Sequence, residues 1–190
     1  VNLDYLDRYV GQNNDSMRYR VFVNNGSRPG YDFTSGGVNA EWGHPFDKSD
    51  WTSYLAGRME YVDLSNDDHD DAKEDLDRNY GIMTARLAFE EDTRYPFDTP
   101  REGYLQRYSV EAGYAGGGLM RLEGSRDQYW RVPMAEKLTY HLAANVGLMP
   151  FIYDNVPIHE RYFLGGDGDM RGFAYRGACY FDHKDDDVPI

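Results

Sequence analysis

Residues 138–148 read Leu-Thr-Tyr-His-Leu-Ala-Ala-Asn-Val-Gly-Leu, and the side chains along this stretch alternate in character. Every second residue from Leu138 to Leu148 is apolar, while the residues between them are polar or small. A period of two held over this length predicts a β-strand with one apolar face and one polar face. This pattern decides the fold class, because it recurs along most of the chain.

Further segments carry the same alternation. It is clear in 51–64, 80–91 and 103–116, weaker in 31–44 and 119–132, and weakest in the first thirty residues, where 17–24 is the best candidate. The composition also favours strands and turns, since 15% of the 190 residues are aromatic, with 17 tyrosines, and 20 are glycines. We therefore predict an all-β chain with about seven strands in antiparallel up-and-down order.

The polar faces of these strands carry charges of both signs, namely Arg58, Glu60, Arg86, Glu90, Arg107 and Glu111. The strands run to about ten to fourteen residues, against five or six in soluble sheets. Aromatic residues gather near the strand ends, at Trp42, Phe46, Trp51, Tyr104, Trp130 and Phe151. Long strands with aromatic ends are typical of a transmembrane β-barrel. The alternative is a soluble β-sandwich, whose apolar faces pack together and whose charged faces meet water.

The connections support the barrel. Short, proline-bearing turns at 44–50, 92–102 and 133–137 alternate with the acidic stretch 65–77, the glycines 116–118 and the long tail from Pro150. Short turns at one end and mostly longer loops at the other are expected of an up-and-down barrel. A sheet in hydrocarbon must close, because every backbone donor and acceptor needs a partner, and the smallest such barrels have about eight strands. We therefore expect the remaining strands to lie outside this sequence.

Several function classes are disfavoured. A net charge of −13 argues against nucleic acid as a partner. The single cysteine, Cys179, rules out an internal disulfide framework, and the five histidines lack zinc-ligand spacing. The acidic stretches 66–71 and 185–187 lack the spacing of a calcium loop and are interpreted as solvated loops. Neither a catalytic motif nor a nucleotide-binding motif is present. We predict no cofactor, no metal and no enzymatic activity.

A glycine-rich stretch follows the last strand, reading Glu-Arg-Tyr-Phe-Leu-Gly-Gly-Asp-Gly-Asp-Met-Arg-Gly-Phe over residues 160–173. Its pattern resembles the hallmark of the Omp85 superfamily, an aromatic residue and a Gly-Gly pair followed by Val-Arg-Gly-Phe or -Tyr in the loop before the twelfth strand. Met170 stands where the family usually has valine. A weaker likeness covers about 31–190, including a periplasmic turn at 92–100 and strands similar to the tenth and eleventh at 129–148. The residues that match the hallmark are Phe163, Gly165, Gly166, Met170, Arg171, Gly172 and Phe173.

The resemblance implies a barrel of sixteen strands in the outer membrane of a Gram-negative-type cell. Residues 1–149 would then be consecutive transmembrane strands with their turns and extracellular loops, and residues 150–190 a long loop folded into the barrel lumen. Arg171 would lie at the tip of that loop and pair with acidic residues on later strands, which are absent from this sequence. The six charges of the polar faces would line the lumen, and periplasmic POTRA domains would lie outside this sequence.

The same resemblance implies a non-enzymatic function, the assembly and insertion of outer-membrane proteins. The barrel seam would open and offer a strand edge to a client strand by β-augmentation. The implied partners are outer-membrane lipid, client outer-membrane proteins and accessory lipoproteins that bind the periplasmic domains. Within the family, a protein translocation or secretion pore is the alternative. Outside it, the alternatives are a passive porin-like channel and a soluble β-sandwich binding module.

Overall fold

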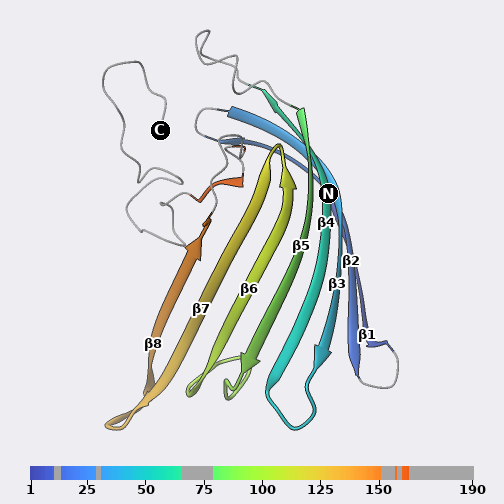
Figure 1. Ribbon diagram of the computed structural model, residues 1–190. Coiled ribbons are helices and arrows are strands. Elements are labelled where there is room, and N and C mark those ends of the chain that lie inside the picture. The colour runs from blue at the N-terminus through green and yellow to red at the C-terminus, as the bar shows by residue number, and fades with distance from the viewer. Residues whose placement is uncertain (11–13, 29–30, 66–78, 151–156, 158–159, 163–190) are drawn as a thin grey trace, which may run out of the picture.

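The computed structural model describes the chain apart from residues 11–13, 29–30, 66–78, 151–156, 158–159 and 163–190. Eight antiparallel strands form one sheet, and each strand pairs with its neighbours in sequence (Figure 1). They are β1 (Asn2–Val10), β2 (Asp15–Arg28), β3 (Tyr31–Pro45), β4 (Trp51–Ser65), β5 (Asn79–Asp92), β6 (Gly103–Ala115), β7 (Gly118–Val132) and β8 (Ala135–Leu148). No helix in the described part is long and apolar enough to cross a membrane.

The predicted all-β, up-and-down order is confirmed, with one strand more than expected. The first thirty residues hold two strands, β1 and β2, where the alternation predicted at least one around 17–24. The register between them shifts between Asp7 and Val10, as at a β-bulge. The alternation already fails before this shift, because the pairing places Leu6 beside Arg18 on one face and Asp7 beside Met17 on the other, so the sequence pattern does not reveal β1.

The register determines which residues share a face of the sheet. From β2 to β6 the pairing runs without interruption. Every second residue of a strand therefore lies in a straight row with its partners on the neighbouring strands. The sheet as a whole is strongly curved, as Figure 1 shows, and therefore has a convex face and a concave face. Side chains two residues apart on a strand lie on the same one of these faces.

The convex face is apolar over most of its area. Its side chains are exposed on every strand; Met83 is 60% exposed and Val146 63% exposed. Those closest to the middle of the strands include Val21, Val38, Leu55, Met59, Leu87, Val110 and Leu142. A soluble sandwich would bury this face against a second sheet, but the eight described strands belong to a single sheet. An apolar surface of this extent is expected where hydrocarbon replaces water as the neighbour.

The concave face is polar over most of its area. A small apolar cluster lies on it towards the end opposite the short turns, and consists of Val62, Leu64, Tyr80, Ile82, Ala115 and Leu119. Val62 is completely buried, and Phe33 and Met149 pack against the cluster. The sheet therefore has its buried core at one end of the concave face and charged side chains over the rest of that face.

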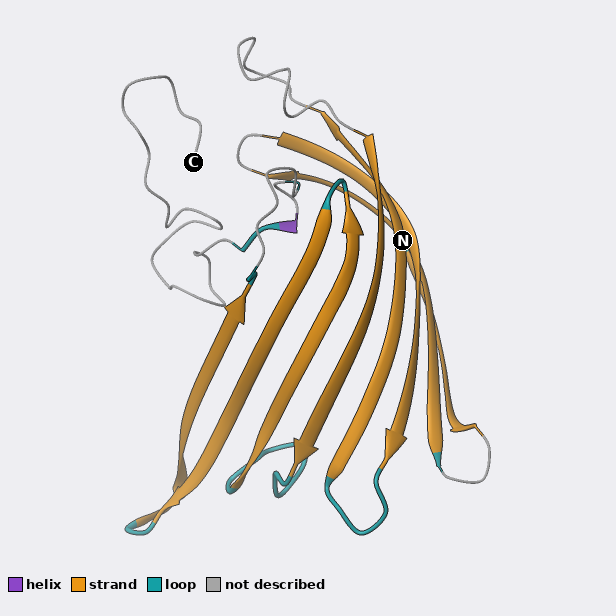
Figure 2. Ribbon diagram, viewed as in Figure 1, coloured by secondary structure: helices purple, strands orange, loops and turns teal. Residues whose placement is uncertain are grey.

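The two ends of the sheet differ in their connections. The turns 46–50, 93–102 and 133–134 lie at one end, where Figure 2 shows them as teal segments below the strands. Of the aromatic residues expected at strand ends, the described ones lie towards this end of the sheet, where Trp51 stacks on Tyr108 and Trp42 stacks on His44. Phe151 lies outside the described residues. The short turns and the described aromatic residues therefore lie at the same end of the sheet.

The backbones of β5 and β6 approach each other closely at Gly113, and this approach can be tested by substitution. A Cβ atom on Gly113 would lie 2.1 Å from the carbonyl oxygen of Met83, whereas a Cβ atom on Gly57 would meet nothing within 4 Å. We expect Gly113→Ala to lower the free energy of unfolding by about 1–3 kcal/mol through overpacking. Gly57→Ala, the matched control, should stay within about 0.5 kcal/mol of the wild type. Urea unfolding of the full-length protein in detergent, followed by tryptophan fluorescence, measures both, and equal stability of the two variants would contradict this packing.

Candidate functional site: the charged concave face

A row of charges crosses the concave face at right angles to the strands. Register pairing places one residue of each strand from β2 to β7 in this row, in the order Arg18, Glu41, Ala56, Arg86, Glu111 and Arg121. Apart from Ala56, the signs alternate along the row. Opposite charges on neighbouring strands attract each other at the distance that sheet geometry imposes.

The small Ala56 lets the row remain connected across β4. The Nη2 atom of Arg86 lies 3.1 Å from Oε2 of Glu41, two strands away, and Arg18 Nη1 lies 3.8 Å from the other oxygen of the same carboxylate. Ala56 is only 5% exposed, because these longer side chains extend over it. Glu41 thus neutralises two arginines that reach it from opposite sides.

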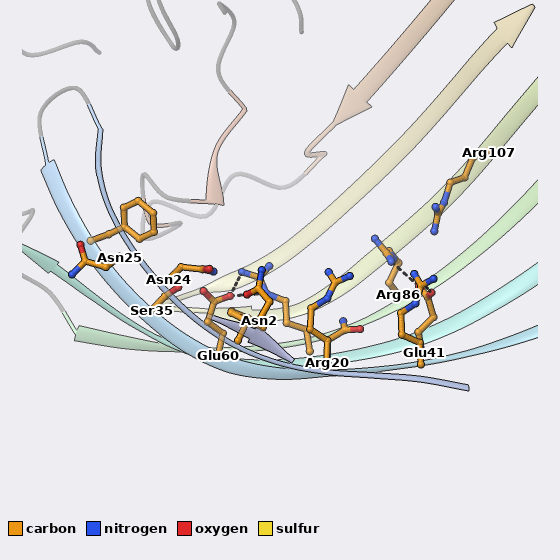
Figure 3. A pocket seen from close by; sticks show the side chains of 14 residues that line it. Asn2, Arg20, Asn24, Asn25, Ser35, Glu41, Glu60, Arg86 and Arg107 are labelled. Carbon is orange, nitrogen blue, oxygen red and sulfur yellow. Dashed lines mark hydrogen bonds and ion pairs between the residues drawn. The ribbon is translucent and has the colours of Figure 1, made fainter. Parts of the chain in front are cut away.

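All six charges predicted for the polar faces lie on the concave face, in pairs or close to one another. Arg58 Nε donates to Glu60 Oε2 at 2.8 Å, and Arg107 Nη1 lies 3.6 Å from Glu90 Oε2. Arg121 Nη1 lies 3.4 Å from Oε2 of Glu111. A cleft of about 720 Å³ opens above the sheet beside these groups, as Figure 3 shows. Its charged lining consists of Arg18, Arg20, Glu41, Arg58, Glu60, Arg86 and Arg107.

Glu160, in the segment after β8, contacts the sheet directly. Its Oε1 accepts a hydrogen bond of 2.9 Å from Nη2 of Arg58 on β4, and its Oε2 pairs with Nη2 of Arg121 on β7. The same Arg121 group also donates to the backbone carbonyl of Glu160 at 2.5 Å. Glu160 is only 4% exposed. One buried carboxylate therefore joins two strands that are separated by β5 and β6.

Tyr162 makes a second contact between this segment and the sheet. Its hydroxyl donates to Oε1 of Glu123 on β7 at 2.9 Å, and its ring lies over Gly147 of β8, where a Cβ atom would come within 2.9 Å of it. The absence of a side chain at Gly147 thus makes room for the tyrosine. Together, Glu160 and Tyr162 attach the segment to the concave face at two neighbouring points.

The electrostatics of both contacts favour attachment near neutral pH. Burial by itself raises the pKa of Glu160, but the guanidinium groups of Arg58 and Arg121 outweigh it and hold that pKa below its ordinary value of 4.5. Burial and the Glu123 carboxylate raise the pKa of Tyr162 to about 12. The carboxylate is therefore charged and the phenol remains a hydrogen-bond donor near neutral pH.

The sequence pattern missed part of this site. Arg121 and Glu41 lie in strands whose alternation is weak, and Glu160 lies outside any strand; its acidic side chain beside the glycine-rich stretch was the only available signal. The seven predicted loop residues, Phe163, Gly165, Gly166, Met170, Arg171, Gly172 and Phe173, lie outside the described residues. The pairing of Arg171 with acidic residues on later strands therefore stays a prediction.

The comparisons with known proteins agree with this geometry. A curved antiparallel sheet with an apolar convex face and a charged concave face defines part of the wall of a membrane β-barrel. The model of the Omp85 superfamily domain matches residues 1–188, and the chain therefore belongs to the Omp85 superfamily.

A solved structure has the same fold. It is BamA from Haemophilus ducreyi lacking POTRA domains 1–3, which superposes with a TM-score of 0.76 at 17% sequence identity. The match covers 94% of this chain and 38% of that one, so this chain spans well under half the length of its structural relative. A comparison with the curated proteins found no match.

Because Glu160 is buried, we expect its replacement by the neutral glutamine to weaken the attachment of the segment strongly. In Glu160→Gln, the guanidinium groups of Arg58 and Arg121 lose the carboxylate that they share, and we expect the attachment to weaken by about 3 kcal/mol or more. Hydrogen–deuterium exchange at residues 160–162 in the full-length protein measures the loss of protection. The matched control is Glu102→Gln, because the Glu102–Arg131 pair is half exposed and should contribute less than about 1 kcal/mol. Similar exchange in both variants would show that Glu160 does not hold the segment.

The lowered pKa of Glu160 also predicts a pH dependence of this attachment. A carboxyl group whose pKa is depressed in the folded state contributes stability above its unfolded pKa and loses it as pH falls through the folded pKa. Protection of residues 160–162 should therefore persist from neutral pH to about 4.5 and decline only below that value. In Glu160→Gln the decline over this range should be absent. A wild-type loss of protection centred above pH 6 would contradict the assignment.

Proposed function

We propose that this chain forms part of an outer-membrane barrel that assembles and inserts other outer-membrane β-barrel proteins. The observation that carries the proposal is the attachment of the segment after β8 to the charged concave face through Glu160. A passive pore benefits from an open interior, whereas this segment occupies the inner side of the wall between β4 and β7. Membership of the Omp85 superfamily and the fold shared with BamA support the same function.

The proposed mechanism needs no enzymatic step. The barrel seam opens, the exposed strand edge pairs with a client strand, and folding of the client into lipid supplies the free energy. An open strand edge in hydrocarbon is costly, so a client strand that satisfies its backbone groups is strongly favoured there. The strands described here would form a stable wall opposite the seam. Their ion pairs and the attached segment would keep that wall rigid while the seam moves.

A protein translocation or secretion pore of the same family is the second candidate. Its specific support is the charged concave face, which a polypeptide could cross without contacting hydrocarbon, and the cleft of about 720 Å³ beside Arg18, Glu41 and Arg86. In either case we propose client proteins and outer-membrane lipid as partners, and accessory lipoproteins that bind periplasmic domains of the whole protein.

Reconstitution of the full-length protein into liposomes separates these functions. A urea-unfolded outer-membrane barrel protein is added as the client, and its folding is followed by heat-modifiable gel mobility and by protection from external protease. We expect folded client in the bilayer, at a rate that Glu160→Gln lowers several-fold and Glu102→Gln leaves unchanged. Protected but unfolded client inside the vesicles would instead identify a translocation pore. Ion conductance without either result would identify a passive channel, and failure of the protein to float with the vesicles would contradict membrane insertion itself.

A further inference from the structure

A polar cluster interrupts the apolar convex face near the end with the short turns. The register pairs Glu91 of β5 with Gln106 of β6, and Gln106 with Arg126 of β7. Among the convex-face positions that the described strands pair, Arg126 is the only one occupied by arginine or lysine. In the hydrocarbon, a charged side chain on the lipid-facing side of a barrel is costly, whereas at the interface its cost is close to zero. The position of Arg126 on the apolar face therefore calls for an explanation.

The side chains around Arg126 hold its guanidinium group in one orientation. Its Nη1 donates to Gln106 Oε1 at 3.1 Å, and its Nη2 donates to Gln128 Oε1 at 2.7 Å. The guanidinium carbon lies 4.4 Å from the centre of the Tyr104 ring. Gln106 is itself buried, and its Nε2 donates to Glu91 Oε2 at 2.5 Å, which orients its amide oxygen towards Arg126.

Within the described part of the chain, Arg126 nevertheless makes no direct ion pair, because Gln106 stands between it and the carboxylate of Glu91. Its two hydrogen bonds go to neutral amide oxygens, and no carboxylate lies within ion-pair distance there, in contrast to Arg58, Arg86, Arg107 and Arg121. A guanidinium group has five N–H donors, so further donors remain free. The side chain is exposed on the convex face. An oriented, exposed guanidinium group without a direct carboxylate partner is well suited to an anion with several oxygen acceptors.

The neighbouring aromatic side chains indicate the level of the bilayer at which this anion would lie. Trp51, whose register partner is Glu91, stacks on Tyr108 with 6.4 Å between ring centres. Trp130, four residues after Arg126, lies against Tyr140 with 5.5 Å between ring centres. Tryptophan and tyrosine prefer the boundary between hydrocarbon and headgroups. The anions available at that boundary are the phosphate groups of the lipids.

We propose that Arg126 binds the phosphate diester of a glycerophospholipid on the convex face, with Tyr104, Gln106 and Gln128 as positioning residues. The lipid phosphate supplies the acceptors for the remaining N–H donors of Arg126. The acyl chains of the same lipid lie along the apolar surface of β6, β7 and β8. This inference rests on the membrane location proposed above, but it is independent of whether the protein inserts, translocates or merely conducts. The wall opposite the seam would thereby hold a lipid at a defined position.

Native mass spectrometry of the full-length protein in detergent tests the proposal with dimyristoyl phosphatidylglycerol as the probe. We expect Arg126→Gln to weaken retention of one lipid about tenfold and to reduce the thermal stabilisation that the lipid confers. The matched control is Arg131→Gln, which removes the same charge from an exposed side chain of the same strand, one whose partner is Glu102. This control should retain the lipid as the wild type does. Dimyristoylglycerol, which lacks the phosphate, should not distinguish Arg126→Gln from the wild type.

Each other outcome overturns the proposal in a recognisable way. Equal lipid retention in Arg126→Gln and Arg131→Gln would show that Arg126 is not the binding group. Protection of the wild type by inorganic phosphate to the same degree as by the lipid would show a free-anion site. If the wild type floats with liposomes but gives either of these two results, only the lipid site is contradicted and the proposed function stands. If the wild type does not float with liposomes, the proposed function itself is contradicted.

Discussion

The unbroken antiparallel register from β2 to β6 is the constraint on which the rest of the structure depends. Because successive residues of a strand point to opposite faces, this register keeps Leu55, Met59 and Met83 on one side and Arg58, Glu60 and Arg86 on the other. A slip of one residue in any strand would move its arginines and glutamates to the apolar side. That exchange is costly in the interior of a membrane, since hydrocarbon solvates charge poorly. The separation of the two faces is therefore a property of strand pairing as much as of composition.

Small residues on the concave face leave space for the contacts between its long side chains. Ala56 leaves the space through which Arg86 reaches Glu41, and Gly147 leaves the space for the ring of Tyr162. Large side chains at these positions would block the contacts. The concave face thus consists of long charged side chains that extend over small ones, which permits ion pairs between strands that are not neighbours.

Glu160 connects this charged surface to the segment after β8. A buried carboxylate is costly unless it is paired, and here two arginines from distant strands compensate it. Those arginines are paired in turn with Glu60 and Glu111, so the segment completes a network that already exists on the wall. On the opposite face, the partners of Arg126 in the described part of the chain are two neutral amide oxygens and the ring of Tyr104, and its remaining donors are directed to the lipid.

The sequence by itself determined the strand type, the shared face of six charges and the family, because a period of two and the Arg-Gly-Phe pattern are local features. It assigned Arg58, Glu60, Arg86, Glu90, Arg107 and Glu111 to one side of the sheet, and the structure places them there. It could not assign β1, where Leu6 and Asp7 reverse the alternation, nor the partners of any charge. Only the tertiary structure decided that Glu160 pairs with Arg58 and Arg121, since these residues are 102 and 39 positions away in the chain. Contacts over such separations arise from register and curvature, which no local pattern records.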